Sequence, residues 1–404
     1  MGEGRVPLID ESILREVVEA LAPLVRAPCS QAERAAADWI ASRLRKAGCH
    51  HVELEDEASW GSFPPNLIAA GLLGIAGGIA GLAGRELLAI GALLVSIVAV
   101  ADEVQNGPRV LRRLLRRKRR TVNVVARVGD PDAPRTIVLM AHHDAAKTGH
   151  LFDQTLLKKI YARWPAFVHA RRSAPPEWWI GVIAPAVAIL GVVTGQGWLI
   201  SLGIAGIVAG VALLADIERS ETVPGANDNL SGVAALVAIA EELSSRPVPG
   251  LDVWIVSTGA EETLQDGIRG FMARHGEELQ RRRAVTLNFE TVGSPHLGLL
   301  EGEGPLWMED YRGPWLRDTI ASIAKGRGIE LERGLRARSS TDSVITSRAG
   351  LPSACLVSLT DWRALANYHL RTDVPENLDY RTIANASRLG VAVAQSFGRG
   401  SLAG

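Results

Sequence analysis

The chain has 404 residues, with 44 basic and 44 acidic side chains, so its formal net charge is zero. This balance excludes a nucleic-acid binder that works through overall charge, and a hydrophobic content of 47% excludes a disordered chain. The length allows one large domain or two ordinary ones. Three cysteines (Cys29, Cys49 and Cys355) are too few for a disulfide-built fold, and their odd number indicates free thiols in a reducing compartment.

The chain begins with two helical patterns and a strand. Apolar residues at helical spacing predict amphipathic helices over residues 11–25 and 31–47, and a short strand is expected over 51–55. The N-terminus is polar and lacks the apolar core of a signal peptide, so we expect no cleaved leader. Residues 1–57 are thus expected to form the first part of an α/β domain.

An apolar block follows at residues 58–118. Residues 67–84 run without a charge for 18 residues and residues 87–101 for another 15. At a rise of about 1.5 Å per residue these stretches span about 27 Å and about 22 Å, against a hydrocarbon thickness of about 30 Å. The block predicts a transmembrane helical hairpin whose second helix gives the weaker signal.

A basic run from Arg109 to Arg120 follows this hairpin, with eight basic residues in twelve. Basic residues beside a membrane helix indicate its cytoplasmic end, and they can also contact anionic lipid. A nucleic-acid patch is the alternative interpretation, and the neighbouring membrane helix disfavours it.

Two strands, expected over residues 122–128 and 136–141, lie within residues 119–149. The second ends in Ala141-His142-His143-Asp144. An imidazole two residues before a carboxylate, just past an apolar strand, can ligate a metal while the carboxylate accepts its other N–H. Alone this signal is weak, because such strings are often ordinary polar loops.

A second apolar block lies at residues 150–220, where residues 178–215 carry no charge and contain a glycine turn. It predicts a second hairpin, with Trp178, Trp179 and Trp198 where interfacial indoles belong. Basic residues precede the block, whereas the only charged residues in the turns of the two hairpins are Arg85 and Glu86, which balance each other. We therefore expect the turns to face outward and the rest of the chain to be cytoplasmic. Two buried hairpins in a soluble core are the alternative, although soluble core helices rarely run this long without a charge.

After the second block comes Gly225-Ala-Asn-Asp228-Asn-Leu-Ser-Gly232, which opens a helix expected over residues 231–243. Asp228 is placed where a carboxylate can bridge two cations, and Ser231 is the expected N-cap. A capping aspartate without any metal is the alternative.

Two further strands end in carboxylates. The strand expected over residues 251–257 leads into Gly259-Ala-Glu261-Glu262, and the strand over 285–290 ends at Glu290. Neighbouring carboxylates at the end of an apolar strand are costly unless a cation or a proton lies between them. We expect one of the pair to bind metal and the other to carry protons.

A helix over residues 314–325, a strand over 354–358 and a helix over 381–395 complete the pattern, with Tyr368 and His369 in the last loop. Strands that alternate with helices predict an α/β fold with a mostly parallel mixed sheet sandwiched by helices and interrupted by the two hairpins. Sites in such sheets lie at the carboxyl ends of strands. Two imidazoles and at least three carboxylates suit two zinc ions that share a carboxylate.

With these loops in view, the chain resembles peptidase family twenty-eight, the co-catalytic zinc exopeptidases that include aminopeptidases, glutamate carboxypeptidase-type enzymes and glutaminyl cyclases. The resemblance covers the chain outside the apolar blocks. It is carried by residues 225–232, 259–262 and 368–379, and by Ser340-Thr-Asp342 ahead of an Ala-Gly-Leu-Pro turn.

The resemblance implies a role for each loop. The implied metal ligands are His142, Asp228, Glu262, Glu290 and His369, with Asp228 shared by both zinc ions. Glu261 is implied as general base and acid, Asp144 as the residue that orients the first imidazole, and Tyr368 as the donor to the oxyanion. Two departures are Glu290, where most relatives have Asp, and His143, a spare imidazole that is able to compete for metal or face substrate.

The implied function is that of a membrane-anchored exopeptidase, most simply an aminopeptidase, which uses two zinc ions to hydrolyse peptide bonds. The alternatives are a related di-zinc deacylase, carboxypeptidase or glutaminyl cyclase, and a catalytically silent membrane scaffold. The expected partners are a peptide substrate and a lipid bilayer, without nucleic acid, and the expected location is the cell membrane with the catalytic domain on the cytoplasmic side. Residues 119–149 and 221–404 are expected to complete the peptidase domain; the substrate-binding residues and the oligomeric state stay open.

Overall fold

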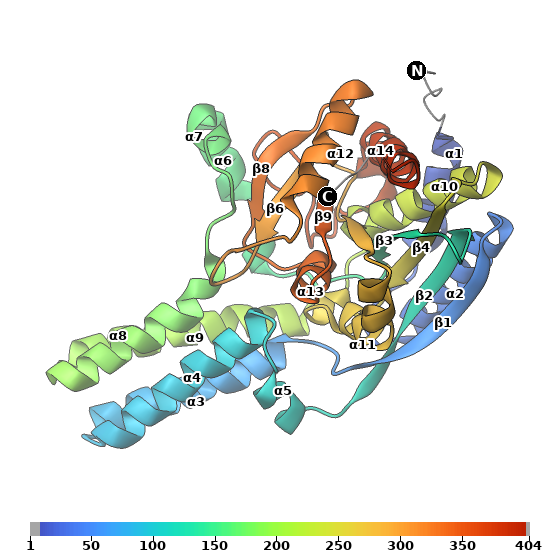
Figure 1. Cartoon of the computed structure of the whole chain (residues 1–404). Helices are drawn as coiled ribbons and strands as arrows, with labels where there is room; N and C mark the ends of the chain where they lie inside the picture. Colours follow the sequence, from blue (N-terminus) through green and yellow to red (C-terminus); the bar gives the residue numbers. More distant parts are fainter. Residues whose placement is uncertain (1–8, 401–404) are drawn as a thin grey trace.

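The structure is a computed structural model that describes residues 9–400. At its centre is a nine-stranded mixed sheet with the strand order β1-β2-β4-β3-β5-β9-β6-β7, in which β8 also pairs with β6 (Figure 1). The strands are β1 (His50–Ser59), β2 (Arg119–Gly129), β3 (Arg135–His142), β4 (Leu251–Thr258), β5 (Val285–Phe289), β6 (His296–Glu303), β7 (Glu309–Asp310), β8 (Glu332–Ala337) and β9 (Ser353–Leu359).

The four central strands, β4, β3, β5 and β9, run parallel to one another. On one flank β1 and β2 pair antiparallel, and on the other β6 is antiparallel to both β9 and β7. Ile137 on β3 lies opposite Val253 on β4 and Val285 on β5, which fixes the register of the centre. The carboxyl ends of β3, β4 and β5 therefore meet at one edge of the sheet.

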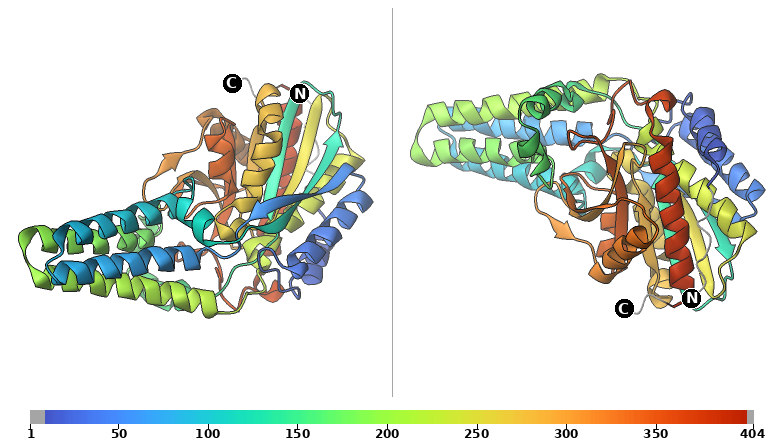
Figure 2. Two further views of the ribbon diagram at one scale, coloured as in Figure 1. Left: turned by 90° about the horizontal axis from the view of Figure 1, so that it is seen from below. Right: turned by 90° about the horizontal axis from the view of Figure 1, so that it is seen from above.

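Helices cover both faces of this sheet (Figure 2). One face carries α1 (Glu11–Leu21), α2 (Gln31–Lys46), α10 (Ser231–Ser245), α12 (Pro314–Gly326) and α14 (Tyr380–Gly398), and the other carries α11 (Asp266–Arg281) and α13 (Asp342–Arg348). Successive side chains of β3 alternate between the two cores: Ile137 and Leu139 face the first, and Val138 and Met140 face the second. Strands buried on both faces read as continuous apolar runs, which is why this one was predicted from the sequence.

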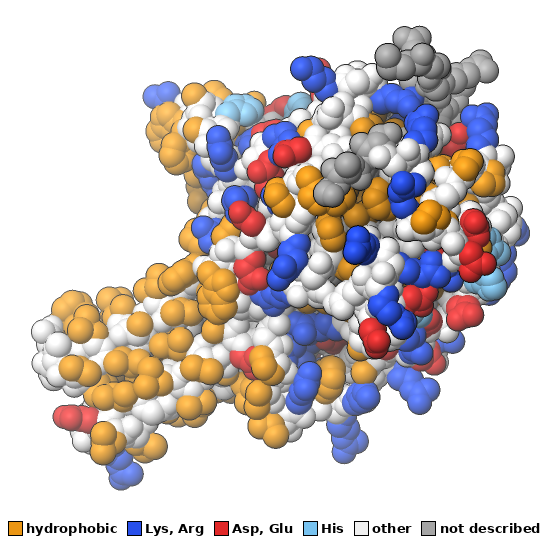
Figure 3. Space-filling view, in the orientation of Figure 1, with side chains coloured by type: hydrophobic (Ala, Val, Ile, Leu, Met, Phe, Trp, Pro, Cys, Tyr) orange, Lys and Arg blue, Asp and Glu red, His pale blue; other side chains and the backbone are white. Residues whose placement is uncertain are grey.

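Four long helices project from the α/β domain as a bundle (Figures 1 and 2). They are α3 (Pro64–Leu82), α4 (Glu86–Val104), α8 (Ile180–Thr194) and α9 (Gly197–Arg219). By length and composition these four helices, the third counted from Glu177, are long and apolar enough to cross a membrane. The face of the bundle seen in Figure 3 is largely hydrophobic and nearly free of charge along its length, in contrast to the charged surface of the α/β domain beside it.

The bundle is held together by small residues that let the helices approach closely. A Cβ added at Gly203 on α9 would lie 2.6 Å from the carbonyl oxygen of Ala184 on α8, and one at Gly71 on α3 would lie 2.4 Å from Val211 on α9. In contrast, large apolar side chains such as Leu87 point outward, with 90% of that side chain exposed. Small residues between helices and large apolar residues outside are typical of membrane bundles.

Some helices and strands of the structure were not predicted from the sequence. They are the strands β6, β7 and β8, the helices α11 and α13, and three short helices, α5 (Val110–Leu115), α6 (Thr155–Arg163) and α7 (Pro165–His169). The basic run after the first hairpin also differs from the expectation. Arg113 and Arg117 are exposed, but Arg109 and Arg112 are buried, because Glu103 and Asp266 pair with them inside the protein. The expected lipid contact is therefore wrong for these two arginines.

Candidate metal centre

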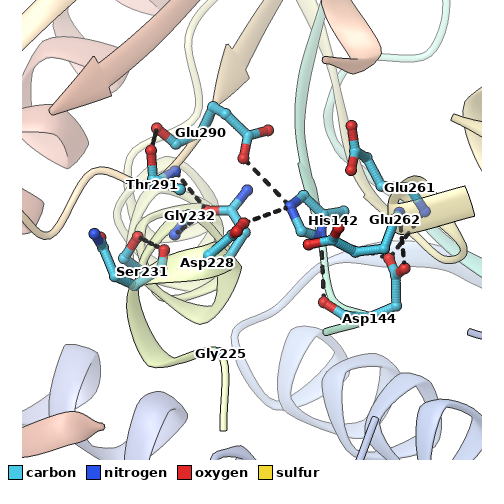
Figure 4. Close-up of polar contacts among 12 residues, drawn as sticks. His142, Asp144, Gly225, Asp228, Ser231, Gly232, Glu261, Glu262, Glu290 and Thr291 are labelled. Atoms are coloured by element: carbon cyan, nitrogen blue, oxygen red, sulfur yellow. Dashed lines mark hydrogen bonds and ion pairs between the residues drawn. The ribbon is translucent and has the colours of Figure 1, made fainter. Parts of the chain in front are cut away.

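The loops that carry the predicted ligands converge at the carboxyl edge of the parallel strands (Figure 4). His142 is the last residue of β3, and Glu290 follows directly after β5. Glu261 and Glu262 lie in a short turn after β4, and Asp228 lies in the irregular turn Ala226–Leu230 that precedes α10. His369 comes from the loop between β9 and α14. The topology thus brings together side chains that are far apart in the sequence.

The first imidazole faces two carboxylates. His142 Nε2 lies 3.2 Å from Asp228 Oδ1 and 3.3 Å from Glu290 Oε1. All three side chains are buried. Their donor atoms form a group compact enough to hold one metal ion.

The second imidazole faces the other oxygen of the same aspartate. His369 Nε2 lies 3.2 Å from Asp228 Oδ2 and 3.4 Å from Glu262 Oε2. These atoms form a second compact donor group, so the two groups share Asp228, one oxygen to each. Asp228 Oδ2 and His369 Nε2 are buried, and although they lie 3.2 Å apart neither makes a well-oriented hydrogen bond. Buried polar atoms without partners are rare, and a cation between them would satisfy both, so the donor set fits metal.

Burial and mutual repulsion shape the charges at this centre. Burial raises the pKa of Glu261 well above its ordinary value, and the charges of Glu290 and Glu262 raise it further. Burial lowers the pKa of His369, but the charge of Glu262 and a contact with Asp228 outweigh it and raise that pKa to about 10. The protein groups alone therefore hold an excess of negative charge, which draws protons and equally suits divalent cations.

Asp144 connects the first imidazole to the loop of paired glutamates. Its Oδ1 accepts a hydrogen bond from the backbone N–H of Glu261 and its Oδ2 one from that of Glu262, both at 3.0 Å. His142 Nδ1 lies 3.2 Å from the Asp144 backbone oxygen and 3.5 Å from its carboxylate. With Nδ1 facing Asp144, Nε2 is the nitrogen directed at the candidate metal site.

The turn that carries Asp228 is fixed by side chains on both sides of it. Asn229 Oδ1 accepts hydrogen bonds from the backbone N–H groups of Gly232, at 3.1 Å, and Thr291, at 2.9 Å. The peptide bond between Asp228 and Asn229 is cis. The expected N-cap, Ser231, is wrong: Ser231 is the first residue of α10 and its hydroxyl donates to the carbonyl of residue 227 at 2.7 Å, whereas Leu230 is the N-cap and makes no side-chain cap hydrogen bond.

Arg26 was not predicted from the sequence, and it has no local motif by which it could be found. Its guanidinium is fully buried and donates to the carbonyls of His143 and Pro224, both at 2.8 Å, and of Gly225 at 3.1 Å. It thereby ties the loop after His142 to the turn before Asp228. Burial lowers its pKa to about 10, while three nearby aspartates oppose that shift.

The two remaining predicted side chains have different surroundings. The ring of Tyr368 stacks on that of His369, with ring centroids 3.9 Å apart, and the ring of Phe152 lies 4.3 Å from His369 on centroids. His143 is buried with its Nδ1 3.0 Å from Ser257 Oγ, and burial lowers its pKa to about 4. His143 belongs to neither of the two donor groups that share Asp228, so the expected competition of His143 for metal is not supported.

Comparison with known proteins gives a fold and a family match over part of the chain. Residues 211–394 match the family model of peptidase family M28. A probable lipoprotein aminopeptidase of Mycobacterium tuberculosis, LpqL, is 29% identical over 197 residues, which are 42% of this chain and 39% of that relative. The alignment thus spans well under half of the relative's length.

Among solved structures, the LapA aminopeptidase of Legionella pneumophila is similar with a TM-score of 0.54 and 12% identity, over 96% of this chain and 72% of that one. A Zn-dependent exopeptidase of Parabacteroides distasonis is similar with a TM-score of 0.54 and 15% identity, over 96% of this chain and 99% of that one. A glutaminyl cyclase of Bacteroides thetaiotaomicron is similar with a TM-score of 0.54 and 14% identity, over 97% of this chain and 99% of that one. The predicted α/β fold is thereby confirmed.

Proposed function

We propose, from the match of residues 211–394 to the model of peptidase family M28, that this chain is a membrane-anchored zinc exopeptidase, specifically an aminopeptidase. The observation that carries the proposal is the pair of compact donor groups that share Asp228, all buried except the half-buried Glu262, with Glu261 beside them. In this proposal the ligands of one ion are His142, Asp228 and Glu290. The ligands of the other are Asp228, Glu262 and His369.

The chemistry then follows from the residues around these ions. Zinc bound there supplies Lewis acidity toward a peptide carbonyl and a water molecule. Glu261 accepts a proton from the attacking water and returns it to the leaving amine, a role suited to a carboxyl group whose pKa burial has raised. The phenol of Tyr368, held against His369 by ring stacking, donates to the oxyanion that develops on the carbonyl.

The Glu261→Gln variant tests the assignment of the base. It removes the proton acceptor but keeps the size of the side chain, so we expect unchanged zinc content and loss of nearly all turnover. Glu53→Gln, at an exposed position on β1, is the matched control and keeps full activity. Turnover at the wild-type rate in Glu261→Gln would show that another group is the base, and a lower zinc content would show that Glu261 is a ligand.

The choice of an aminopeptidase over related amide chemistries requires a substrate panel. Solved structures of aminopeptidases and of glutaminyl cyclases are equally similar to this chain in fold. The panel therefore contains an aminoacyl reporter, an acyl-amino acid and a peptide with N-terminal glutamine. We expect hydrolysis of the aminoacyl reporter. If the reporter is not hydrolysed, cyclisation of the glutaminyl peptide or release of the acyl group would identify one of the alternatives.

We further propose that the two hairpins span the membrane, with the α/β domain in the cytoplasm. The exposed basic residues Arg113 and Arg117 lie at the domain end of the bundle, and Arg85 lies in the turn between α3 and α4. The cysteine in an Arg85→Cys variant should react in intact cells with a membrane-impermeant maleimide. The cysteine in an Arg117→Cys variant should react only after lysis, and the reverse pattern would invert the orientation.

The substrate class is proposed from how the second hairpin joins the site. The chain leaves the site at Lys147 and returns at Thr222, and these two residues pair as an antiparallel bridge. His142 and Asp228 lie five and six residues beyond the two sides of this bridge, so the centre is tied to the base of the bundle. We propose that membrane-associated peptides are the substrates. A lipid-anchored aminoacyl peptide should be turned over faster than its soluble equivalent, and equal rates would refute this.

A further inference from the structure

The chain that leaves the first hairpin is built into the loop of the paired glutamates. Arg109 Nη1 donates to Asp266 Oδ1 at 2.6 Å, and Arg112 Nη1 donates to the carbonyl of Thr263 at 2.7 Å. Arg112 Nε also donates at 2.6 Å to Glu103, in the last turn of α4. Because Thr263 and Asp266 lie one and four residues after the paired glutamates, the end of a bundle helix and the glutamate loop share one buried network.

Two amide side chains extend this network to the carboxylate of Glu261. Asn106, two residues past the end of α4, donates through Nδ2 to Gln265 Oε1 at 2.9 Å. Gln265 in turn donates through Nε2 to Glu261 Oε1 at 2.7 Å and to the carbonyl of Ser340 at 2.8 Å. Asn106 and Gln265 are 5% and 2% exposed, so water competes little for these bonds.

The orientation of both amides is dictated by the groups at the two ends of the relay. Asn106 Oδ1 accepts from Arg109 at 2.5 Å and from Arg269 at 2.9 Å. A guanidinium only donates, so the oxygen of Asn106 faces the arginines and its NH₂ group faces Gln265. Gln265 must then turn its oxygen to Asn106 and its NH₂ group to Glu261 and to the Ser340 carbonyl, which only accepts.

The backbone at this junction is strained, which is a separate observation. Arg109, Leu264 and Gln265 have φ values of 58°, 67° and 63°, in the left-handed region that non-glycine residues rarely adopt. Such conformations cost free energy and cluster where the surroundings over-determine a functional geometry. Here they lie on both sides of the contact between the first hairpin and the glutamate loop.

We propose that Asn106 and Gln265 are positioning residues for Glu261, so that the end of the first hairpin sets the orientation of the proton-carrying carboxylate. This inference rests on the proposed function, because it takes Glu261 as the general base. A hydrogen bond to one carboxylate oxygen fixes the plane of the group and leaves the other oxygen to accept a proton. The hairpin is then part of the catalytic geometry in addition to being an anchor.

The first test removes the donor to Glu261. Gln265→Met keeps the length of the side chain but not its NH₂ group. Hydrogen bonds to charged groups are strong enough that we expect kcat to fall about tenfold, with KM and zinc content within about twofold of wild type. Gln280→Met, which removes another Gln side chain that donates to a backbone carbonyl, is the control and keeps wild-type kcat.

The second test reverses the relay from its far end. Asn106→Asp keeps an oxygen toward Arg109 and Arg269, so the variant retains their contacts and is expected to fold even where Gln265→Met does not. It replaces the donor to Gln265 with an acceptor, which turns the amide of Gln265 over and presents its oxygen to Glu261. We expect kcat to fall about tenfold, again with unchanged KM and zinc content.

The double variant separates positioning from general structural damage. If Asn106 acts through Gln265, Asn106→Asp has no further effect on kcat in the Gln265→Met background. If the two substitutions instead lower kcat independently, so that their effects multiply in the double variant, the proposal is overturned. It is also overturned if both single variants keep the wild-type kcat, or if only their KM changes. These outcomes leave the proposed function intact as long as Glu261→Gln is inactive; an active Glu261→Gln would instead remove the proposed function itself.

Discussion

Asp373 holds the backbone of Asp228 in place by accepting the N–H of Asp228 at 3.1 Å through Oδ2. Its Oδ1 accepts the N–H of Asn227 at 2.7 Å, and the side chain is buried. Asp373 lies four residues after His369. One carboxylate therefore ties the loop of the second imidazole to the turn of the shared aspartate.

Asp373→Asn tests this connection. The amide offers one acceptor oxygen where the carboxylate offered two, so one of the two buried N–H groups faces a donor. A buried N–H without a partner costs about 1–3 kcal/mol, and Asp228 is free to shift. We expect zinc affinity to fall by about 10- to 100-fold, as for other residues that orient ligands, measured by competition with a chelator. Asp361→Asn, at an exposed site, is the control; equal affinities in both variants would contradict the connection.

The number of ions follows from the sharing of Asp228. If both donor groups hold zinc, Asp228→Ala removes a ligand from each group, whereas Glu262→Ala removes a ligand from one group only. We therefore expect little or no zinc in the first variant and about one ion per chain in the second, measured by elemental analysis. Equal zinc content in the two variants would show that Asp228 does not bridge two ions.

A prediction on pH dependence comes from Glu303, at the end of β6. Burial raises the pKa of this carboxyl to about 8. An unfolded glutamate titrates near 4.3, so between about pH 4.3 and 8 the folded chain binds the extra proton. Stability from this group is thus present at low pH and is lost as the pH rises through this window.

Glu303→Gln removes this titration. The difference in melting temperature, variant minus wild type, should grow from pH 5 to pH 8 and stay level above pH 8. Thermal unfolding in one detergent at each pH measures it, and Glu53→Gln, at an exposed position, should show no such trend. A constant difference across the range would show that Glu303 titrates normally in the folded protein.

How far the sequence predicts the fold depends on local composition. The strand around Ile137 was predicted because its whole apolar run is buried on both faces. Strand β6 was not predicted, because Gly298 and Gly302 interrupt it and only its pairing with β7, β8 and β9 makes it a strand. Helix α11 was missed for a similar reason, since glycines weaken its helical signal. Two of them, Gly267 and Gly270, lie where a Cβ would meet the Gly259 carbonyl at 2.0 Å or the Glu57 carboxylate at 2.3 Å.

In the candidate site, too, some residues were predicted from the sequence and others were not. Residues such as His142 and Glu262 were recognisable because their types and their positions after apolar strands indicate metal chemistry. Arg26, Asn106 and Gln265 were not, because the placement of each depends on a partner more than 100 residues away in the chain: Arg26 on His143, and Asn106 and Gln265 on each other. Whether such a polar residue is a solvated loop residue or a buried support is decided by tertiary packing, which a single sequence does not display.

The last prediction concerns the glycines of the helical bundle. A Cβ at Gly203 would lie 2.6 Å from the carbonyl oxygen of Ala184 and 2.7 Å from the Cβ of Ala188, so α8 and α9 have no room for a side chain there. Gly91 on α4 has no atom within 4 Å of the same added Cβ. Gly203→Leu should therefore force the helices apart, at a cost of about 1–3 kcal/mol or more, and lower the melting temperature in bilayer nanodiscs.

Gly91→Leu is the matched control, because it adds the same side chain to an open helix face. In a bilayer that face meets lipid, so the added leucine should leave the melting temperature and the dispersity of the protein unchanged. In lipid-free buffer the same substitution adds apolar surface to water and should promote aggregation. If Gly91→Leu destabilised the protein in nanodiscs as much as Gly203→Leu, the face at Gly91 would be covered by protein, and the membrane assignment of that helix would fail.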